Sequence, residues 1–156
     1  MTSRIFATAT IALMQPQDLP AVIEIERQSN SHPWTEHNFR DAMTSGYLSL
    51  VARDHGEVCA FAIARAVVDE AELLLIAVAP SQRRQGVAAL LWMEIAQRLQ
   101  IAGTTKLFLE VRASNVPARS FYASRGFSQV GIRKNYYPKG VHHGDREDAV
   151  QMQVTL

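Results

Sequence analysis

The stretch that decides the fold covers residues 71–103 and reads AELLLIAVAPSQRRQGVAALLWMEIAQRLQIAG. It begins with a continuous apolar run, residues 73–78, whose length and composition are typical of a strand buried on both faces. Pro80 ends that strand, because proline has no N–H to donate to a ladder. From Val87 the apolar residues recur at helical spacing as far as Gly103, a residue type that commonly follows a helix. The stretch therefore predicts a buried strand, a basic loop and an amphipathic helix.

The loop, residues 81–86, has features of a phosphate-binding turn. The first N–H groups of a helix have no intrahelical partner and carry the positive end of the helix dipole. Gly86 and Ala88 present little bulk there, and Arg83 and Arg84 add positive charge. The loop lacks the Gly-Lys-Ser/Thr ending of a Walker loop and the three glycines of a dinucleotide fingerprint. Phosphate binding and an ordinary connection with surface arginines are equally open from the loop alone.

The rest of the chain predicts a mixed α/β fold in one domain covering residues 1–156. Asp18 and Thr35 are of the residue types that cap helices, and we expect each to begin one. Two more helices are expected from Val87 and over residues 115–125. Strands are expected at residues 4–13, 47–53, 57–68, 71–78, 106–111, 128–134 and 147–154. This order implies a mixed sheet with helices on both faces.

Composition excludes some classes of function. The chain has 156 residues and a formal charge of +1, so nothing attracts it as a whole to nucleic acid or to a membrane. The one cysteine, Cys59, lies in an apolar run and is expected to be a small buried filler. No Cys/His cluster has zinc-ligand spacing, and His142 and His143 form an adjacent pair in a predicted loop. We therefore expect no metal site.

The N-terminal residues fit two interpretations. Arg4 followed by apolar residues as far as Met14 resembles a signal peptide. Thr8 and Thr10 interrupt the apolar run, however, and the alternation favours a strand. We therefore expect a cytoplasmic protein.

Several motifs point to one family. The pattern Arg83-x-x-Gly86-x-Ala88, after a strand ending in Ile76-Ala77-Val78, resembles the acetyl-CoA pyrophosphate loop of the GCN5-related N-acetyltransferases (GNAT). Many members have glycine where this chain has Ala88. From about Asp18 to the C-terminus the chain is similar to the RimI-like ribosomal-protein alanine N-acetyltransferases. The motifs that carry this resemblance are LEVRASN at 109–115, FYxxxGF at 121–127, RKNYYP at 133–138 and GDREDA at 144–149.

The resemblance implies a GNAT fold with a mixed, mostly antiparallel sheet. Its fourth and fifth strands splay apart and admit the pantetheine arm of acetyl-CoA, whose amides bond to the exposed strand much as an added strand would. The residues implied to contact acetyl-CoA are Ile76, Ala77, Val78, Arg84, Gln85, Gly86, Val87, Ala88, Ala89 and Asn115. A helix cap is an equally good local explanation for Asn115.

Acetyl transfer to an amine needs a neutral nucleophile and a protonated leaving group. The pKa of an α-amine is about 8, against about 10.4 for lysine, so a carboxylate is an adequate base for a protein N-terminus. The resemblance makes Glu110 that base; the alternative is a strand-end glutamate paired with Arg112. It makes Tyr122 the acid that protonates the CoA thiolate. Core packing is the alternative for Tyr122, because Phe121-Tyr122 lies on a predicted amphipathic helix.

The acceptor groove is less well determined. Trp34, Tyr136 and Tyr137 are expected to line it, or else to pack at its rim. In the family the acceptor begins Ala-Arg, so a carboxylate is expected to meet that arginine. Four candidates are open: Glu36, Asp145, Glu147 and Asp148. His32 stands where relatives often have another residue before Pro-Trp, which leaves the fine selectivity open.

Three functions compete. The resemblance implies a monomeric enzyme that acetylates the N-terminus of ribosomal protein 18 of the small subunit, with no nucleic acid or membrane as partner. The others are an acetyltransferase for lysine, a polyamine or an antibiotic amine, and a CoA-binding module without turnover. Glu110 and Tyr122 together argue against the module, and the motifs at 133–148 argue against the small-molecule enzymes.

Overall fold

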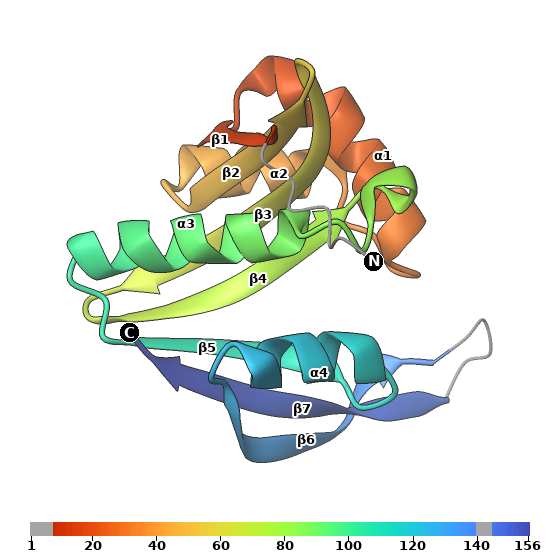
Figure 1. Ribbon diagram of the computed structural model, residues 1–156. Coiled ribbons are helices and arrows are strands. Elements are labelled where there is room, and N and C mark those ends of the chain that lie inside the picture. The colour runs from red at the N-terminus through yellow and green to blue at the C-terminus, as the bar shows by residue number, and fades with distance from the viewer. Residues whose placement is uncertain (1–7, 140–144) are drawn as a thin grey trace, which may run out of the picture.

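The computed structural model describes residues 8–139 and 145–156, which form one sheet covered by helices (Figure 1). The sheet has seven strands: β1 (Thr10–Leu13), β2 (Leu48–Asp54), β3 (Glu57–Val67), β4 (Glu70–Val78), β5 (Lys106–Arg112), β6 (Ser128–Pro138) and β7 (Arg146–Thr155). The α-helices are α1 (Leu19–Ser29), α2 (Glu36–Thr44), α3 (Val87–Ile101) and α4 (Val116–Ser124). Short 3₁₀ turns, η1 (Pro16–Asp18) and η2 (Pro80–Gln82), precede α1 and α3. The predicted order of strands and helices is confirmed.

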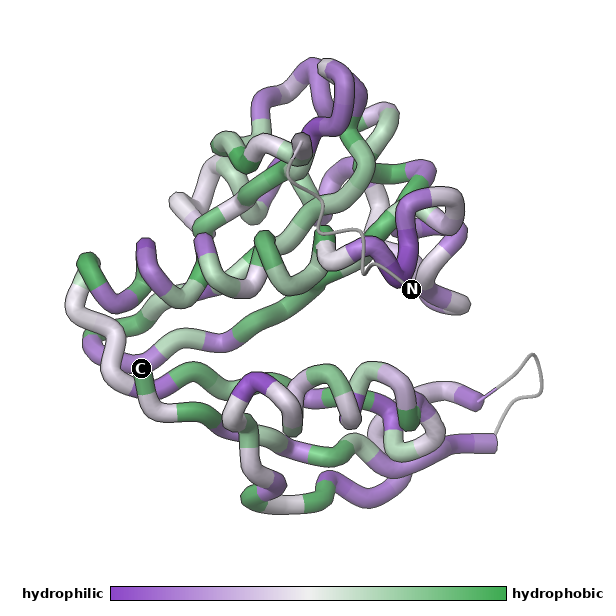
Figure 2. The backbone as a smooth tube through the Cα atoms, viewed as in Figure 1, coloured by the Kyte–Doolittle hydropathy of each residue, from purple (hydrophilic) through white to green (hydrophobic). Residues whose placement is uncertain are grey.

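The sheet is mixed, with strand order β1-β2-β3-β4-β5-β7-β6. Every neighbouring pair is antiparallel except β4 and β5, which are parallel. On one face α1 and α2 bury a core that includes Leu19, Phe39 and Phe61. On the other face α3 and α4 cover a second core around Leu91 and Leu107. Apolar residues follow the central strands, and hydrophilic residues gather at the outer loops (Figure 2).

The two halves of the sheet separate between β4 and β5. The parallel ladder joins only Glu70, Ala71 and Glu72 to residues 106–108, and beyond it the strands diverge (Figure 1). A bulge lies at this point: Ile63 faces Leu75 while Ala64 faces Leu73, so Leu74 is the extra residue on β4. Bulges bend the strand that carries them. The bulge therefore provides a local cause for the separation.

The bulge also corrects one prediction. We expected residues 73–78 to be buried on both faces, but residues 74–78 are only partly buried. Before the bulge, Ala71 and Leu73 belong to the α3 core; after it, Ile76 and Val78 contact that core while Leu75 and Ala77 contact the other. The second half of β4 does not pair with β5, so its apolar side chains line a gap in the sheet. The apolar run thus marks a cavity wall.

Several local predictions can be compared with the structure. The hydroxyl of Thr35 accepts a bond from Asn38 N at 3.2 Å, so the predicted cap of α2 is confirmed. Asp18 stands at the N-cap position of α1, as expected, but its carboxylate makes no capping bond: it accepts from Gln15 N at 2.8 Å and pairs with Arg53 at 2.7 Å. Asp18 and Arg53 lie far apart in the sequence, so local sequence patterns could not predict their ion pair.

Other boundaries differ by a few residues. Of the first predicted strand, residues 10–13 form β1, and residues 4–7 lie outside the described part of the chain. β6 continues to Pro138, four residues beyond its predicted end at 134.

Cys59 is buried, as expected. His142 and His143 lie outside the described residues. None of the helices described here has both the length and the apolar character that crossing a membrane requires.

Candidate active site

A cavity of about 460 Å³, which we call the loop cavity, lies between the β4–α3 loop and α4. Its walls are the end of β4, the loop itself, the first turn of α3 and one side of α4. Eight of the predicted acetyl-CoA contacts line it: Ile76, Ala77, Val78, Arg84, Gly86, Val87, Ala88 and Ala89. Gln85 is absent from the wall, and its side chain donates to Ser81 O at 3.3 Å.

The backbone of the loop explains its glycine. Arg84 and Gly86 have positive φ angles of 61° and 83°, and Gly86 directly precedes α3. A Cβ built on Gly86 would meet nothing within 4 Å, so the backbone conformation, and not the packing, favours glycine there. The first amides of α3 therefore face an open approach, and they lack intrahelical partners.

The two arginines of the loop have different surroundings. Arg83 Nε donates to Val78 O at 3.0 Å and its Nη2 donates to Ser29 Oγ at 3.1 Å, so this side chain fixes the loop to β4 and α1. Arg84 is exposed and lines the cavity. Open helix amides, nearby cations and the apolar end of β4 suit a phosphate that continues into a less polar arm. These residues fit the acetyl-CoA that the motifs predict.

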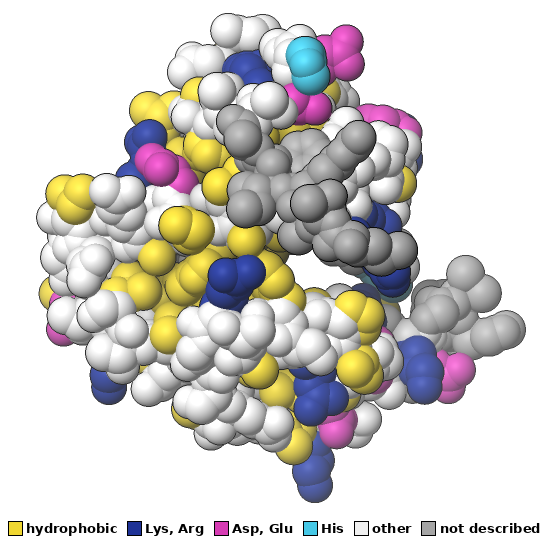
Figure 3. All heavy atoms as spheres, in the orientation of Figure 1, with side chains coloured by type: hydrophobic (Ala, Val, Ile, Leu, Met, Phe, Trp, Pro, Cys, Tyr) yellow, Lys and Arg dark blue, Asp and Glu magenta, His cyan; other side chains and the backbone are white. Residues whose placement is uncertain are grey.

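A second cavity, of about 580 Å³, lies where β4 and β5 diverge; we call it the central cavity. Its walls come from the end of α1 and the loop after it, from β4 and β5, and from the end of β6. The space-filling view shows the molecule hollowed between its upper and lower halves (Figure 3). Ser29, Ile76, Ala77, Ala118 and Tyr122 line both this cavity and the loop cavity. The two cavities therefore share a wall, and Tyr122 is part of it.

Glu110 projects into the central cavity from β5. Its Oε1 lies 3.3 Å from Gln151 Nε2, which donates to it, and 3.4 Å from Arg133 Nη1. The side chain is 18% exposed. Arg112 does not pair with Glu110; it bonds to Glu147 at 3.0 Å and to Pro138 O at 2.7 Å. The simplest structural alternative for Glu110, a pair with Arg112, is therefore not what the chain forms.

Tyr122 is buried on α4, and its ring contacts those of Phe121 and Phe127 with centroids 5.5 and 5.4 Å apart. Burial raises the pKa of its phenol well above the usual value, so the hydroxyl stays protonated across ordinary pH. The ring packing that we considered as an alternative is therefore present. The position between the two cavities is present as well, and the catalytic role stays a prediction.

Asn115 serves as the N-cap of α4, where its Oδ1 accepts from Ala118 N at 3.2 Å. The capping explanation is thus confirmed. Asn115 lines the central cavity and is not part of the loop cavity wall. Its predicted contact with acetyl-CoA stays a prediction.

The three predicted acceptor residues, Trp34, Tyr136 and Tyr137, all line the central cavity. The Arg112 guanidinium lies over the Tyr137 ring at 4.6 Å, and burial and the nearby charge of Glu110 raise the pKa of Tyr137 to about 12. Arg133 lies over Tyr136 at the same distance, 4.6 Å. These contacts hold two phenols beside Glu110.

The sequence reasoning missed Glu26, which lines the central cavity from α1 and is 2% exposed. It accepts a bond from Trp34 N at 3.0 Å, and so ties the loop after α1 to the helix. Burial raises the pKa of its carboxyl, and its bonds to Trp34 and Asn30 offset part of that rise. The sequence feature that could have identified Glu26 is its position beside the apolar face of α1.

The four carboxylates that we considered as partners for a basic residue of the acceptor lie outside the two cavities. Glu36 pairs with Arg40 on the surface of α2 at 3.6 Å, Glu147 bonds to Arg112, and Asp148 accepts from Asn135 N at 2.9 Å. Asp145 is exposed. None of the four lines the loop cavity or the central cavity. Glu72, which we did not consider, does line the central cavity.

The part of the chain that the structure describes contains no group of three or more His, Cys, Asp or Glu side chains able to hold a metal ion.

Comparisons with known proteins agree with this geometry. The family model "Acetyltransferase (GNAT) family" matches residues 19–127. A ribosomal protein bS18-alanine N-acetyltransferase of Escherichia coli K12 is 40% identical over 147 residues, which are 94% of this chain and 97% of that protein. A putative enzyme of the same name from Bacillus subtilis 168 is 33% identical over 95% of this chain and 96% of its own length. The crystal structure of the ribosomal-protein-S18-alanine N-acetyltransferase of E. coli superposes with a TM-score of 0.87 at 39% identity, covering 95% of this chain and 94% of that one.

Proposed function

The chain belongs to the acetyltransferase (GNAT) family, and we propose that it acetylates the N-terminal alanine of ribosomal protein bS18 in the cytoplasm. The observation that carries this proposal is the 40% identity to the E. coli enzyme of that name, which extends over 94% of this chain. The acetyl donor is acetyl-CoA, whose thioester supplies an activated acetyl group.

The two cavities suit the two reactants. We infer that the amides at the start of α3, with Arg84, hold the pyrophosphate of acetyl-CoA in the loop cavity. The uncovered edge of β4 at Ile76–Val78 offers backbone groups to the pantetheine amides. The acceptor occupies the central cavity, whose wall includes the loop after α1 and the end of β6. This arrangement brings the acceptor amine and the acetyl group together near Tyr122.

We assign Glu110 as the base. The α-amine of a protein has a pKa of about 8, so most of it is protonated at neutral pH and must lose a proton before it can attack. The Glu110 carboxylate lies in the central cavity and accepts that proton, either directly or through a water molecule. Gln151 and Arg133 hold the carboxylate in place at 3.3 and 3.4 Å.

We assign Tyr122 as the acid. The leaving group is a thiolate, and a hydroxyl donor near it lowers the cost of its departure. Tyr122 lines both cavities, and its raised pKa keeps the phenol protonated in the resting enzyme, so that its hydroxyl can donate to the thiolate. Solvent then restores the proton.

A peptide panel tests the proposal. Acetyl transfer would be measured by mass spectrometry on peptides that carry the bS18 N-terminal sequence, on variants of the first residue, and on a lysine peptide with a blocked N-terminus. We expect acetylation of the α-amine of the alanine peptide and little transfer to lysine. Transfer to the lysine peptide alone would assign the enzyme to another acceptor class, and no transfer to any amine would contradict the proposal.

A further inference from the structure

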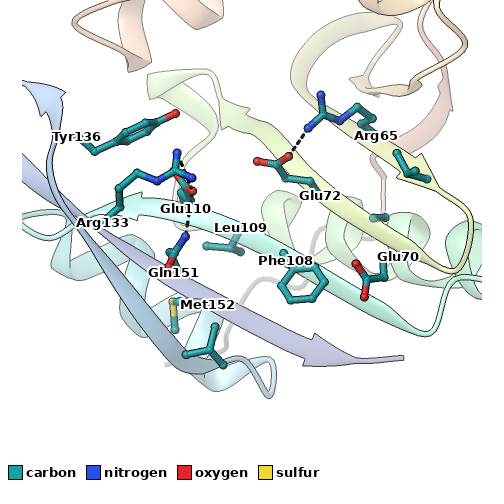
Figure 4. Close-up of a pocket in the computed structure, with 13 residues that line it drawn as sticks. Arg65, Glu70, Glu72, Phe108, Leu109, Glu110, Arg133, Tyr136, Gln151 and Met152 are labelled. Carbon is teal, nitrogen blue, oxygen red and sulfur yellow. Dashed lines mark hydrogen bonds and ion pairs between the residues drawn. The ribbon is translucent and has the colours of Figure 1, made fainter.

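A third cavity, of about 600 Å³, opens on the face of the sheet beside the central cavity; we call it the sheet cavity (Figure 4). Three residues line both the sheet cavity and the central cavity: Glu72, Glu110 and Tyr136. A chain that leaves the central cavity through the sheet cavity therefore passes Glu72. This carboxylate has no part in the chemistry assigned above.

Glu72 and Glu110 project from the same face of the sheet. Glu72 lies opposite Phe108 in the parallel ladder, and Glu110 is two residues further along β5. Neighbouring strands lie about 4.8 Å apart and two residues advance a strand by about 6.6 Å, so regular sheet geometry from the last ladder pair corresponds to about 8 Å between the two Cα atoms. An extended acceptor advances about 3.3 Å per residue. With its α-amine at Glu110, the side chain of its second residue is within reach of Glu72.

Glu72 keeps the capacity to bind a cation although it already has a partner. Its Oε2 pairs with Arg65 Nη2 at 2.6 Å, and the two side chains are 37% and 44% exposed. A carboxylate accepts up to about four hydrogen bonds. In Figure 4 the other oxygen of Glu72 points away from Arg65, toward the side where Glu110 and Tyr136 lie. Arg65 lines the sheet cavity but not the central cavity, so the part of an acceptor that is still held in the central cavity meets only the anionic member of the pair.

We propose that Glu72 is a specificity-determining residue, which favours acceptors with Arg or Lys at the second position and disfavours Asp or Glu there. This inference rests on the proposed function, because it concerns the residue after the acetylated one. The partial exposure of the pair limits the effect, since exposed ion pairs contribute little. We expect kcat/KM to favour arginine over glutamate at the second position by roughly fivefold.

A charge swap tests this proposal without removing the ion pair. The double variant Arg65→Glu/Glu72→Arg keeps opposite charges at the two positions but presents a cation to the central cavity. Peptides that differ only at the second residue (Arg, Gln or Glu) would be compared by kcat/KM. We expect the swap to invert the preference, so that glutamate exceeds arginine.

A second ion pair supplies the matched control. Glu94 and Arg98 on α3 pair at 2.7 Å with exposures of 31% and 38%, and neither residue lines the loop, central or sheet cavity. Glu94→Arg/Arg98→Glu should therefore keep the wild-type preference. If the Arg65/Glu72 swap does not fold, Glu72→Gln replaces it and should bring the Arg/Glu ratio close to one.

The outcomes separate the two proposals. If peptides are acetylated and the Arg/Glu ratio stays unchanged in both Glu72 variants, Glu72 does not read the second residue, and the proposed function stands. If the wild-type enzyme acetylates no peptide α-amine, the proposed function fails and this inference fails with it. A shift of the ratio in the α3 control would likewise overturn the assignment to Glu72.

Discussion

The loop cavity and the central cavity are built in different ways. The loop cavity takes most of its wall from one continuous segment, the end of β4 and the start of α3, and offers backbone amides and small side chains. The central cavity is assembled from α1, β4, β5, α4 and β6, and offers the side chains of Glu26, Glu72, Glu110 and Tyr137. The loop cavity is therefore formed mostly by one local segment, whereas the central cavity depends on contacts between segments that are far apart in the sequence.

This difference suggests how the enzyme divides its tasks. Backbone amides bind a phosphate whatever the neighbouring side chains are, so a short motif is sufficient for the donor. Recognition of an acceptor depends on side chains that distant segments hold in place. Substitutions should therefore separate into those that affect acetyl-CoA binding and those that affect the acceptor. Only residues that line both cavities should affect both acetyl-CoA and the acceptor.

Tyr122→Phe tests the wall that the two cavities share, and we expect it to have the largest effect. The ring and its contacts with Phe121 and Phe127 remain, but the hydroxyl is lost. If Tyr122 is the acid, kcat should fall about a hundredfold or more, while acetyl-CoA affinity and melting temperature stay close to wild type. Steady-state kinetics and calorimetry measure both. A wild-type rate would reduce Tyr122 to a packing residue shared by the two cavities.

Glu110→Gln tests the central cavity without changing the wall of the loop cavity. Gln keeps the shape and an oxygen acceptor for Gln151, but it cannot take a proton. We expect kcat/KM for an alanine peptide to fall up to about a hundredfold at neutral pH. The loss should shrink above the amine pKa of about 8, because the neutral amine then forms without a base.

The pH–rate profiles of the two proteins decide this assignment. A purely structural Glu110, held between Gln151 and Arg133, predicts a loss that does not change with pH and a lower melting temperature. Parallel profiles from neutral to alkaline pH would therefore exclude Glu110 as the base. Acetyl-CoA affinity should be unchanged in either case, because Glu110 does not line the loop cavity.

Gly86→Val tests the loop cavity alone. A φ of 83° strains a β-branched residue, and the conformation that aims the first α3 amides would be lost. We expect acetyl-CoA to bind about tenfold more weakly in calorimetry, consistent with a strain of about 1–2 kcal/mol. Gly56→Val is the matched control: Gly56 has φ 82° and open space around it, but lies in the β2–β3 turn. Equal affinity in both variants would place the pyrophosphate elsewhere.

The same contrast explains what the sequence could predict. Residues 71–103 predicted β4, the loop and α3, because apolar periodicity, Pro80 and Gly103 act locally. The four carboxylates proposed for the acceptor lie outside the cavities, whereas Glu26 and Glu72 line the central cavity. Their positions depend on the bulge at Leu74 and on a bond between Glu26 and Trp34, eight residues apart. Helical periodicity places Glu26 beside the apolar face of α1, but no periodicity or short motif predicts its bond with Trp34.

Glu26→Gln gives the smallest expected effect and tests whether the central cavity carries a cost in stability. Burial raises the pKa of Glu26 above its ordinary 4.5, so the folded state holds the proton more tightly than the unfolded state. That contribution to stability is fully present below pH 4.5 and is lost as the pH rises through the folded pKa. Above pH 4.5, folding must therefore either bury a charge at the wall of the cavity or take up a proton there.

Gln does not titrate, so it avoids that cost, and it can still accept the bond from Trp34 N. We expect Glu26→Gln to melt a few degrees higher at pH 7, as about 1 kcal/mol does in a chain of this size, and the gain to shrink as the pH falls toward 4.5. Glu24→Gln, on the exposed side of the same helix, is the control and should change little at either pH. A lower melting temperature for Glu26→Gln at pH 7 would mean that the ionised carboxylate itself holds the loop after α1. The acceptor cavity would then depend on a buried charge that its own hydrogen bonds stabilise.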